Sequence, residues 1–173
     1  GGYILATAHR AENVDVPIRL AGIIEGLEKV AEELKLPIIF SLHPRTRGRL
    51  AEFKITPAGS IRMIEPVGFL DFLLLEKNAK LIMTDSGGLQ EEAFILKVPC
   101  VTLRDNTERP ETVEYGANII AGTEALKILS AANEMLKKDL SLNRWDHPFG
   151  DGQAGEKIIE IIARHINNQD KAL

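Results

Sequence analysis

The sequence has one cysteine, Cys100, and no long run of apolar residues. A single cysteine cannot form an internal disulfide, nor a zinc site with other cysteines. The longest apolar runs, such as residues 72–75 (FLLL), are far below the roughly 18 residues that a membrane span requires. We therefore expect no membrane partner. No metal-ligand spacing is visible either, so we expect no metal.

Basic residues are not in excess. The chain of 173 residues has 21 Lys and Arg against 25 Asp and Glu, a formal net charge of −4. Nucleic-acid-binding proteins usually carry a basic excess, so we expect no nucleic acid partner. No secretory leader is visible, which favours a cytoplasmic location. The chain begins Gly-Gly-Tyr without a methionine, and we interpret it as a piece of a longer protein.

Short apolar runs alternate with stretches of helical periodicity. Strands are expected at 3–8, 38–42, 61–64, 81–84, 100–103 and 118–121. Helices are expected at 16–34, 45–53, 70–78, 89–97, 111–115, 124–138 and 153–166. In the first long helix, Asp15 is the expected N-cap and Ile18 the start of the buried face. This alternation predicts an α/β fold with a Rossmann-like, doubly wound parallel sheet.

Unusual polar residues follow five of the predicted strands. In an open parallel sheet, ligands bind beyond the carboxyl ends of the strands. Histidines, arginines, acids and paired glycines occupy these positions in residues 9–13, 43–45, 65–69, 85–88 and 104–111. We therefore expect a ligand site at this edge of the sheet.

The segment 85–88 (DSGG) precedes a predicted helix. Gly87 and Gly88 allow close approach of the backbone, and the N–H groups of a helix start favour an anion. A pyrophosphate would suit such a position. The alternative is an ordinary strand–helix turn in which Ser86 is the N-cap.

Acidic and basic side chains near this turn have two interpretations each. Glu92 lies one helical turn after Gly88 and could accept hydrogen bonds from two ribose hydroxyls, or it could be a solvated acid of the first turn. Its neighbour Glu91 is better explained as such a solvated acid. Arg109 could bind a phosphate through both guanidinium nitrogens, or pair with Glu108 or Glu111.

Histidine and aromatic residues complete the set of candidates. A lone histidine such as His9 or His43 is more often a structural hydrogen-bonding residue than a catalyst. Phe72 is most simply a core residue at helical spacing with Leu75, although an aromatic at the ligand edge could contact a base. Cys100 is expected to be a small buried apolar residue.

Four segments together resemble the non-hydrolysing UDP-N-acetylglucosamine 2-epimerases. They are residues 7–13 (TAHRAEN), 85–93 (DSGGLQEEA), 104–111 (RDNTERPE) and 150–154 (GDGQA), and their order and spacing match over essentially the whole chain. The resemblance implies the C-terminal half of a two-domain GT-B architecture. Residues 1–150 would form the UDP-binding domain, and 151–173 a C-terminal helix that packs back toward an N-terminal domain.

The resemblance also implies the reaction and its residues. Such enzymes interconvert UDP-N-acetylglucosamine and UDP-N-acetylmannosamine by anti elimination and re-addition of UDP, without a cofactor. Substrate-binding positions would be Val67, Phe72, Ser86, Gly87, Gly88, Glu92 and Arg109. His9 would be catalytic, near the diphosphate and the reacting sugar. A second, activating nucleotide-sugar site would involve His9, Arg10, Glu12 and His43.

Several consequences and alternatives follow. The carboxylates expected to act as acid and base belong to the N-terminal domain of the family, so this chain alone is expected to be inactive. The full-length parent would be a homodimeric cytoplasmic isomerase serving cell-surface polysaccharide synthesis. A UDP-sugar glycosyltransferase, a hydrolysing epimerase and a non-catalytic nucleotide-sugar sensor remain as alternatives.

Overall fold

The computed structural model describes residues 2–138 and 148–169. The chain separates into two units, Gly1–Asn143 and Arg144–Leu173. The strands are β1 (Ile4–Thr7), β2 (Ile38–Ser41), β3 (Ile61–Ile64), β4 (Leu81–Thr84), β5 (Cys100–Thr102) and β6 (Asn118–Ile120). The helices are α1 (Ala11–Val14), α2 (Pro17–Leu34), α3 (Pro44–Glu52), α4 (Phe69–Asn78), α5 (Gly87–Leu96), α6 (Pro110–Glu114), α7 (Ala125–Lys137) and α8 (Ala154–Gln169).

All six described strands form one sheet in the order β3-β2-β1-β4-β5-β6, and each neighbouring pair is parallel. This is the Rossmann strand order. Successive strands are added toward one edge from β1 to β3 and toward the other edge from β4 to β6, so the order reverses between the adjacent strands β1 and β4. The predicted doubly wound α/β sheet is therefore confirmed. The loops after β1 and β4 meet at this reversal, where nucleotides bind in such folds.

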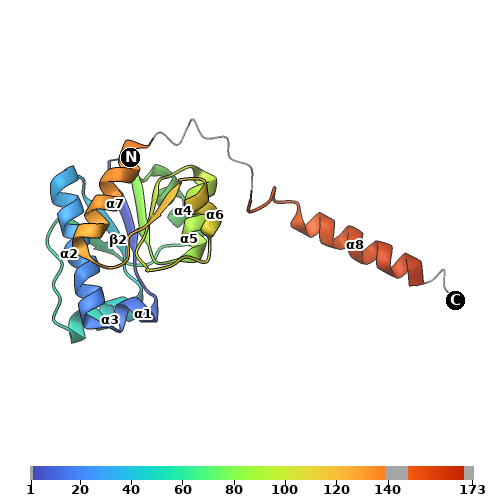
Figure 1. The fold of residues 1–173 in the computed structure, drawn as a ribbon. Coiled ribbons are helices and arrows are strands. Elements are labelled where there is room, and N and C mark those ends of the chain that lie inside the picture. The colour runs from blue at the N-terminus through green and yellow to red at the C-terminus, as the bar shows by residue number, and fades with distance from the viewer. Residues whose placement is uncertain (1, 139–147, 170–173) are drawn as a thin grey trace. The chain divides into compact units, whose positions relative to one another are not determined.

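Helices cover both faces of the sheet, with α2 and α7 on one side and α4, α5 and α6 on the other (Figure 1). Two glycines allow α7 and the loop before it to approach α2. A Cβ on Gly22 would lie 2.4 Å from the Thr123 carbonyl oxygen, and one on Gly26 would lie 2.7 Å from Ile128. Larger side chains at these positions would push the two helices apart.

The core supports the central strands. Every residue of β1 and β4 is buried, as expected for strands with helices on both faces. On the α4–α5 side, a cluster that includes Leu5, Ile82, Ala93 and Cys100 packs under these helices. Cys100 is 2% exposed, so its predicted burial is confirmed.

The start of α2 differs from the prediction. Ile18 is 81% exposed, because the buried face of this helix starts at Leu20. The N-cap is Val16 rather than Asp15. The Asp15 carboxylate instead accepts hydrogen bonds from Arg45 and Arg49 of α3. The short helix α1 was not predicted, because its four residues are too few for a periodic pattern.

The second unit contains α8. It corresponds to the helix predicted at 153–166 but begins one residue later and ends three residues later. Its exposed isoleucines are Ile158, Ile159, Ile161, Ile162 and Ile166. Turn residues are frequent at 140–151 and predict an irregular stretch there, but most of it falls on residues 139–147, which lie outside the described part of the chain. Among the helices described, none is both long and apolar enough to cross a bilayer.

Candidate nucleotide-binding site

Asp85 joins the loops that follow β1 and β4. Its side chain is fully buried and accepts hydrogen bonds from the backbone N–H groups of His9 at 3.0 Å and Arg10 at 2.9 Å. The Asn13 side-chain amide donates to the same carboxylate at 3.0 Å. A buried carboxylate with several donors is a rigid anchor. Asp85 therefore fixes the loop that carries the candidate residues His9 and Arg10.

His9 is oriented by the same carboxylate. Its Nδ1 lies 3.3 Å from Asp85 Oδ1, and its ring centroid lies 5.7 Å from that of His43. Burial is the main cause that lowers the pKa of His9; Asp85 opposes this, whereas His43 and Arg10 add to it. The neutral imidazole can then donate from Nδ1 to Asp85, which leaves Nε2 as an acceptor.

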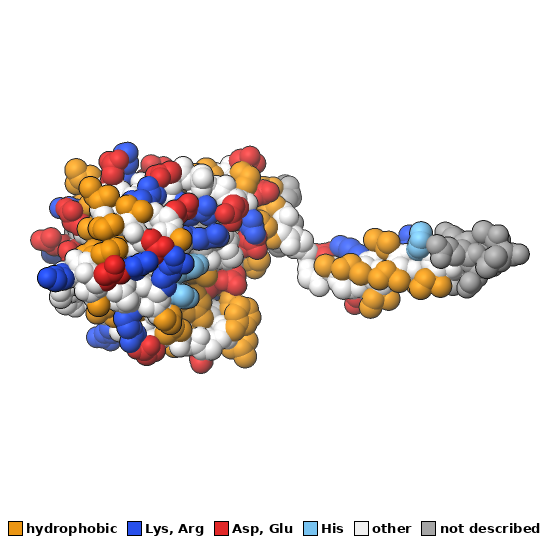
Figure 2. All heavy atoms as spheres, turned by 90° about the horizontal axis from the view of Figure 1, so that it is seen from below, with side chains coloured by type: hydrophobic (Ala, Val, Ile, Leu, Met, Phe, Trp, Pro, Cys, Tyr) orange, Lys and Arg blue, Asp and Glu red, His pale blue; other side chains and the backbone are white. Residues whose placement is uncertain are grey.

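The two histidines border a small cavity of about 130 Å³, which also involves Pro66 and Leu89. Figure 2 views the molecule from the side on which α1 and α3 lie in Figure 1, and shows histidine side chains of the larger unit among basic and acidic ones. The structure thus brings the residues after β1 and β2 to one surface, next to the start of α5.

The glycine turn has the geometry of a helix start. Ser86 is the N-cap of α5, and its Oγ accepts from the Leu89 N–H at 3.5 Å. The Ser86 N–H donates to Thr84 Oγ1 at 3.0 Å. This is the ordinary capping role that the sequence also allowed. The first N–H groups of a helix have no partner within it, so Gly87 and Gly88 still offer donors to an anion.

A network of side chains from two loops lies against this turn. A Cβ on Gly87 would be 3.3 Å from Glu108 Oε2. Glu108 accepts from the Arg10 guanidinium at 3.3 Å and from the Arg104 guanidinium at 3.2 Å. The hydrogen bond from Arg104 is the largest cause that lowers the pKa of Glu108, and the charge of Arg10 lowers it further. An anion therefore already lies beside the glycine turn.

The predicted partners of Arg109 were wrong in part. Its Nε donates to Glu91 of α5 in an ion pair, and its Nη1 donates to the Glu108 carbonyl oxygen at 2.8 Å. The spacing of the sequence suggested the carboxylates of Glu108 and Glu111 instead. The interpretation of Glu91 as a solvated acid is also wrong, because this residue is half-buried in the ion pair. The pair places the Arg109 guanidinium beside the first turns of α5.

Two further candidates, Glu12 and Glu92, each interact with another ionisable side chain. Glu12 accepts from Arg104 Nε at 2.7 Å. Glu92 is half-buried on α5, and its carboxyl interacts with that of Glu76 on α4. Glu76 was missed in the sequence. The signal was present, because Phe72, Leu75 and Glu76 share one face of α4 and the other two are apolar.

The remaining candidates lie on the loop after β3 and on α4. Val67 is 41% exposed in that loop. Phe72 and Leu75 are partly buried against the core cluster, which agrees with the simpler interpretation of Phe72. Phe72 lies on α4, which packs beside α5, the helix that carries Glu92. Among residues 2–138 and 148–169, no three His, Cys, Asp or Glu side chains form a group that could hold a metal ion.

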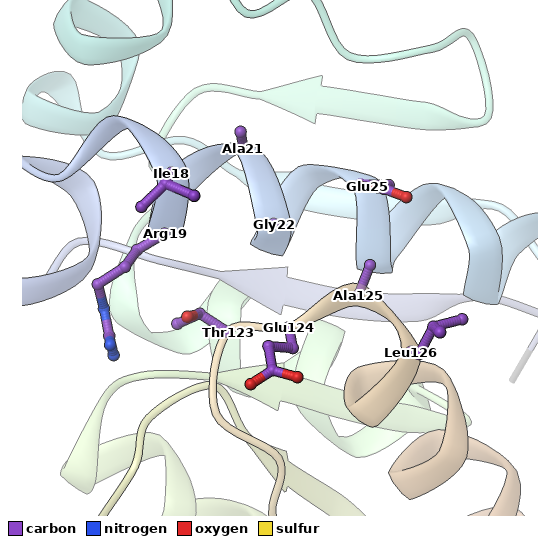
Figure 3. A pocket seen from close by; sticks show the side chains of 9 residues that line it. All are labelled: Ile18, Arg19, Ala21, Gly22, Glu25, Thr123, Glu124, Ala125 and Leu126. Carbon is purple, nitrogen blue, oxygen red and sulfur yellow. The ribbon is translucent and has the colours of Figure 1, made fainter.

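A larger cavity of about 510 Å³ lies elsewhere, between α2 and the start of α7 (Figure 3). Its lining includes Ile18, Gly22 and Leu126, and none of the predicted site residues. Most of the residues that line this cavity belong to the surfaces of α2 and α7. The glycine turn with its surrounding charges therefore remains the better candidate site.

Comparison with known proteins identifies the family of this chain. The family model described as UDP-N-acetylglucosamine 2-epimerase matches residues 1–163. The UDP-N-acetylglucosamine 2-epimerase of Methanocaldococcus jannaschii is 56% identical over 164 residues, which is 92% of this chain and 44% of that protein. The UDP-2,3-diacetamido-2,3-dideoxy-D-glucuronate 2-epimerase of Pseudomonas aeruginosa is 40% identical, over 94% of this chain and 45% of that protein.

A solved structure is also similar. The crystal structure of the Methanocaldococcus jannaschii enzyme in complex with UDP-GlcNAc and UDP superposes with a TM-score of 0.87 and 55% identity, covering 94% of this chain and 45% of that chain. This chain thus spans less than half the length of these relatives and corresponds to their C-terminal part. Its sheet is one Rossmann-like half of their GT-B architecture. The chain belongs to the UDP-N-acetylglucosamine 2-epimerase family.

Proposed function

We propose that this chain is the UDP-binding half of an enzyme that interconverts UDP-N-acetylglucosamine and UDP-N-acetylmannosamine. The observation that supports this most is the glycine turn at the start of α5, with Arg10 and Arg109 within its charge network. The start of a helix combined with guanidinium groups suits a diphosphate. In the cell, the enzyme would be cytoplasmic and supply cell-surface polysaccharide synthesis.

The proposed reaction is an elimination followed by an addition. A base removes the C2 proton, the C1–O bond to UDP breaks, and the electron pair of the C–H bond forms the C1–C2 double bond of a 2-acetamidoglucal. A proton then adds to the opposite face of C2, and UDP adds back to C1. Negative charge develops on the leaving UDP, so donors that face its phosphates stabilise the transition state.

The residues of this chain divide that work. Ser86, Gly87 and Gly88 would bind the diphosphate through α5, and Arg109 would bind the phosphate region. Glu92 would accept hydrogen bonds from the ribose hydroxyls, with Val67 and Phe72 near the uridine. His9, held by Asp85, would present Nε2 to the diphosphate and the reacting sugar. No metal or organic cofactor is required for these steps.

A second nucleotide sugar would bind at the neighbouring surface. His9, Arg10, Glu12 and His43 follow β1 and β2, and the ring centroids of His9 and His43 are 5.7 Å apart. Arg10 is paired with Glu108, so a ligand phosphate at this surface would compete with that pair. We propose that these four residues form an activating site, as the resemblance to the family implies.

The other half of the enzyme would supply the acid and base groups. We propose that residues 1–150 form the UDP-binding domain and that the helix within 151–173 packs on an N-terminal domain of the same protein. The exposed isoleucines of α8 support this, because a stripe of such residues favours a partner. Without that half, α8 is expected to repack or to mediate self-association, and the parent is expected to be a homodimer.

One alternative substrate has a specific observation in its favour. The Pseudomonas aeruginosa relative, 40% identical over 94% of this chain, is named for a UDP-2,3-diacetamido glucuronate sugar. The two substrates share UDP and a 2-acetamido group, so a domain that binds mainly UDP would suit both. Discrimination between them would depend on contacts to the sugar.

The test is to incubate the full-length parent with UDP-N-acetylglucosamine and to follow the products by NMR. Formation of UDP-N-acetylmannosamine supports the proposal. Free N-acetylmannosamine would instead indicate a hydrolysing epimerase, and transfer to an acceptor a glycosyltransferase. Binding without turnover would indicate a nucleotide-sugar sensor. The chain of 173 residues is expected to bind UDP and to form no product by itself.

A further inference from the structure

Glu76 is a buried acid that accepts no hydrogen bond. Its residue is 0% exposed, and in the described part of the chain no donor group bonds to either carboxyl oxygen. It lies on the face of α4 that packs on the core, with Phe72 and Leu75 as neighbours on that face. An ionised carboxylate is costly in such surroundings. The side chain must therefore be neutral or interact with a nearby group.

The nearby groups come from two elements. α4 and α5 pack side by side on one face of the sheet (Figure 1). The carboxyl of Glu92 on α5 interacts with that of Glu76 on α4. From β5, the buried thiol of Cys100 is the other ionisable neighbour, and burial, then Glu76, raise its pKa. Burial and the Glu92 carboxyl together raise the pKa of Glu76 to about 8. At neutral pH Glu76 is therefore protonated and can donate an O–H.

We propose that Glu76 is a positioning residue that donates a hydrogen bond to Glu92 and holds it toward the ribose of the bound nucleotide. This inference rests on the proposed function, in which Glu92 binds the ribose. One bond from Glu76 leaves several lone pairs of the Glu92 carboxylate for two ribose hydroxyls. When Glu76 loses its proton, two carboxylates face each other and repel, and Glu92 moves away from the ligand.

The test is the pH dependence of nucleotide affinity. UDP would be titrated into the chain by calorimetry from about pH 6.5 to about pH 9.5, a range in which most UDP already carries its full charge. His9 is neutral over most of this range, because its pKa is lowered. If only the protonated form of Glu76 supports tight binding, affinity falls about tenfold between pH 7 and pH 9.

Two variants separate positioning from a structural role. Glu76→Gln keeps a donor and cannot ionise, so its affinity should stay near that of the wild type at pH 7 and should not fall at pH 9. Glu76→Met removes the donor and should bind weakly at both values. An alkaline loss that is unchanged in Glu76→Gln would overturn the proposal, because another group would then be titrating.

A matched ligand tests the same point without any substitution. 2′,3′-Dideoxy-UDP lacks the hydroxyls that Glu92 would accept, so wild-type affinity for it should be weaker and independent of pH in this range. A loss equal to that of UDP would contradict the role of the ribose. If wild-type protein binds UDP at no pH, the proposed function fails, and this inference fails with it.

Discussion

The carboxylate of Glu108 lies directly against Gly87, 3.3 Å from where a Cβ would be. It is held there by Arg10 and Arg104 at 3.3 and 3.2 Å. Because the start of α5 is the proposed phosphate site, this carboxylate occupies space and arginine donors that a diphosphate would use.

Removing the charge of Glu108 should therefore strengthen UDP binding. The variant Glu108→Gln is expected to bind UDP about fivefold more tightly, because one like charge near the phosphates is lost. Affinity for uridine, which has no phosphate, should not change. Glu52→Gln is the matched control, since Glu52 also pairs with an arginine, Arg49, but on α3. Weaker UDP binding by Glu108→Gln would show that the carboxylate organises the site instead.

Gly87 should not tolerate a side chain. In Gly87→Ala the new methyl group would meet Glu108, or the phosphate that replaces it, and UDP affinity should fall by about tenfold or more. Gly48→Ala is the control, because nothing lies within 4 Å of a Cβ there. Calorimetry and far-UV circular dichroism should show folded protein in both cases. Equal affinities in the two variants would place the phosphates elsewhere.

Arg109 should bind the phosphate region despite its ion pair with Glu91. Arg109→Ala is expected to lower UDP affinity about tenfold, as for loss of a charge-assisted hydrogen bond. Arg109→Lys should be intermediate, because a lysine keeps the charge without the planar fork. Arg164→Ala removes an equal charge from α8 and is the control. Unchanged affinity in Arg109→Ala would remove this residue from the site.

Asp85 should contribute to stability as well as to the site. Asp85→Ala leaves the backbone N–H groups of His9 and Arg10 without their acceptor and removes one of the two acceptors of the Asn13 amide. The free energy of unfolding should fall by about 3 kcal/mol, measured by urea denaturation. Asp105→Ala breaks an exposed pair with Arg19 and should cost at most about 0.5 kcal/mol. Similar losses in the two variants would mean that the buried bonds contribute little.

The sequence predicted the sheet well because alternation of apolar strands and periodic helices is a local pattern. The sequence placed Ile18 wrongly on the buried face of α2. Apolar periodicity identifies the buried face of a helix only approximately, and the face that α2 packs on the core is the neighbouring one, which starts at Leu20. The sequence predicted the wrong partner for Arg109 because spacing identifies neighbours along the chain, whereas Glu91 comes from another helix.

The candidate site was predicted in outline rather than in its contacts. Gly87, Gly88 and His9 became candidates because parallel strands end at one edge of the sheet. The pairing of Glu76 with Glu92 depends on how α4 packs against α5, which no local pattern specifies. Its one visible signal was an acid within an otherwise apolar helix face.

We propose above that this domain binds UDP through the start of α5. The most direct measurement is a calorimetric titration of the chain with UDP beside a titration with uridine at neutral pH. We expect one UDP per chain and much weaker binding of uridine, since the diphosphate provides the contacts with the glycine turn and Arg109. Absence of UDP binding, or equal affinity for the two ligands, would contradict it.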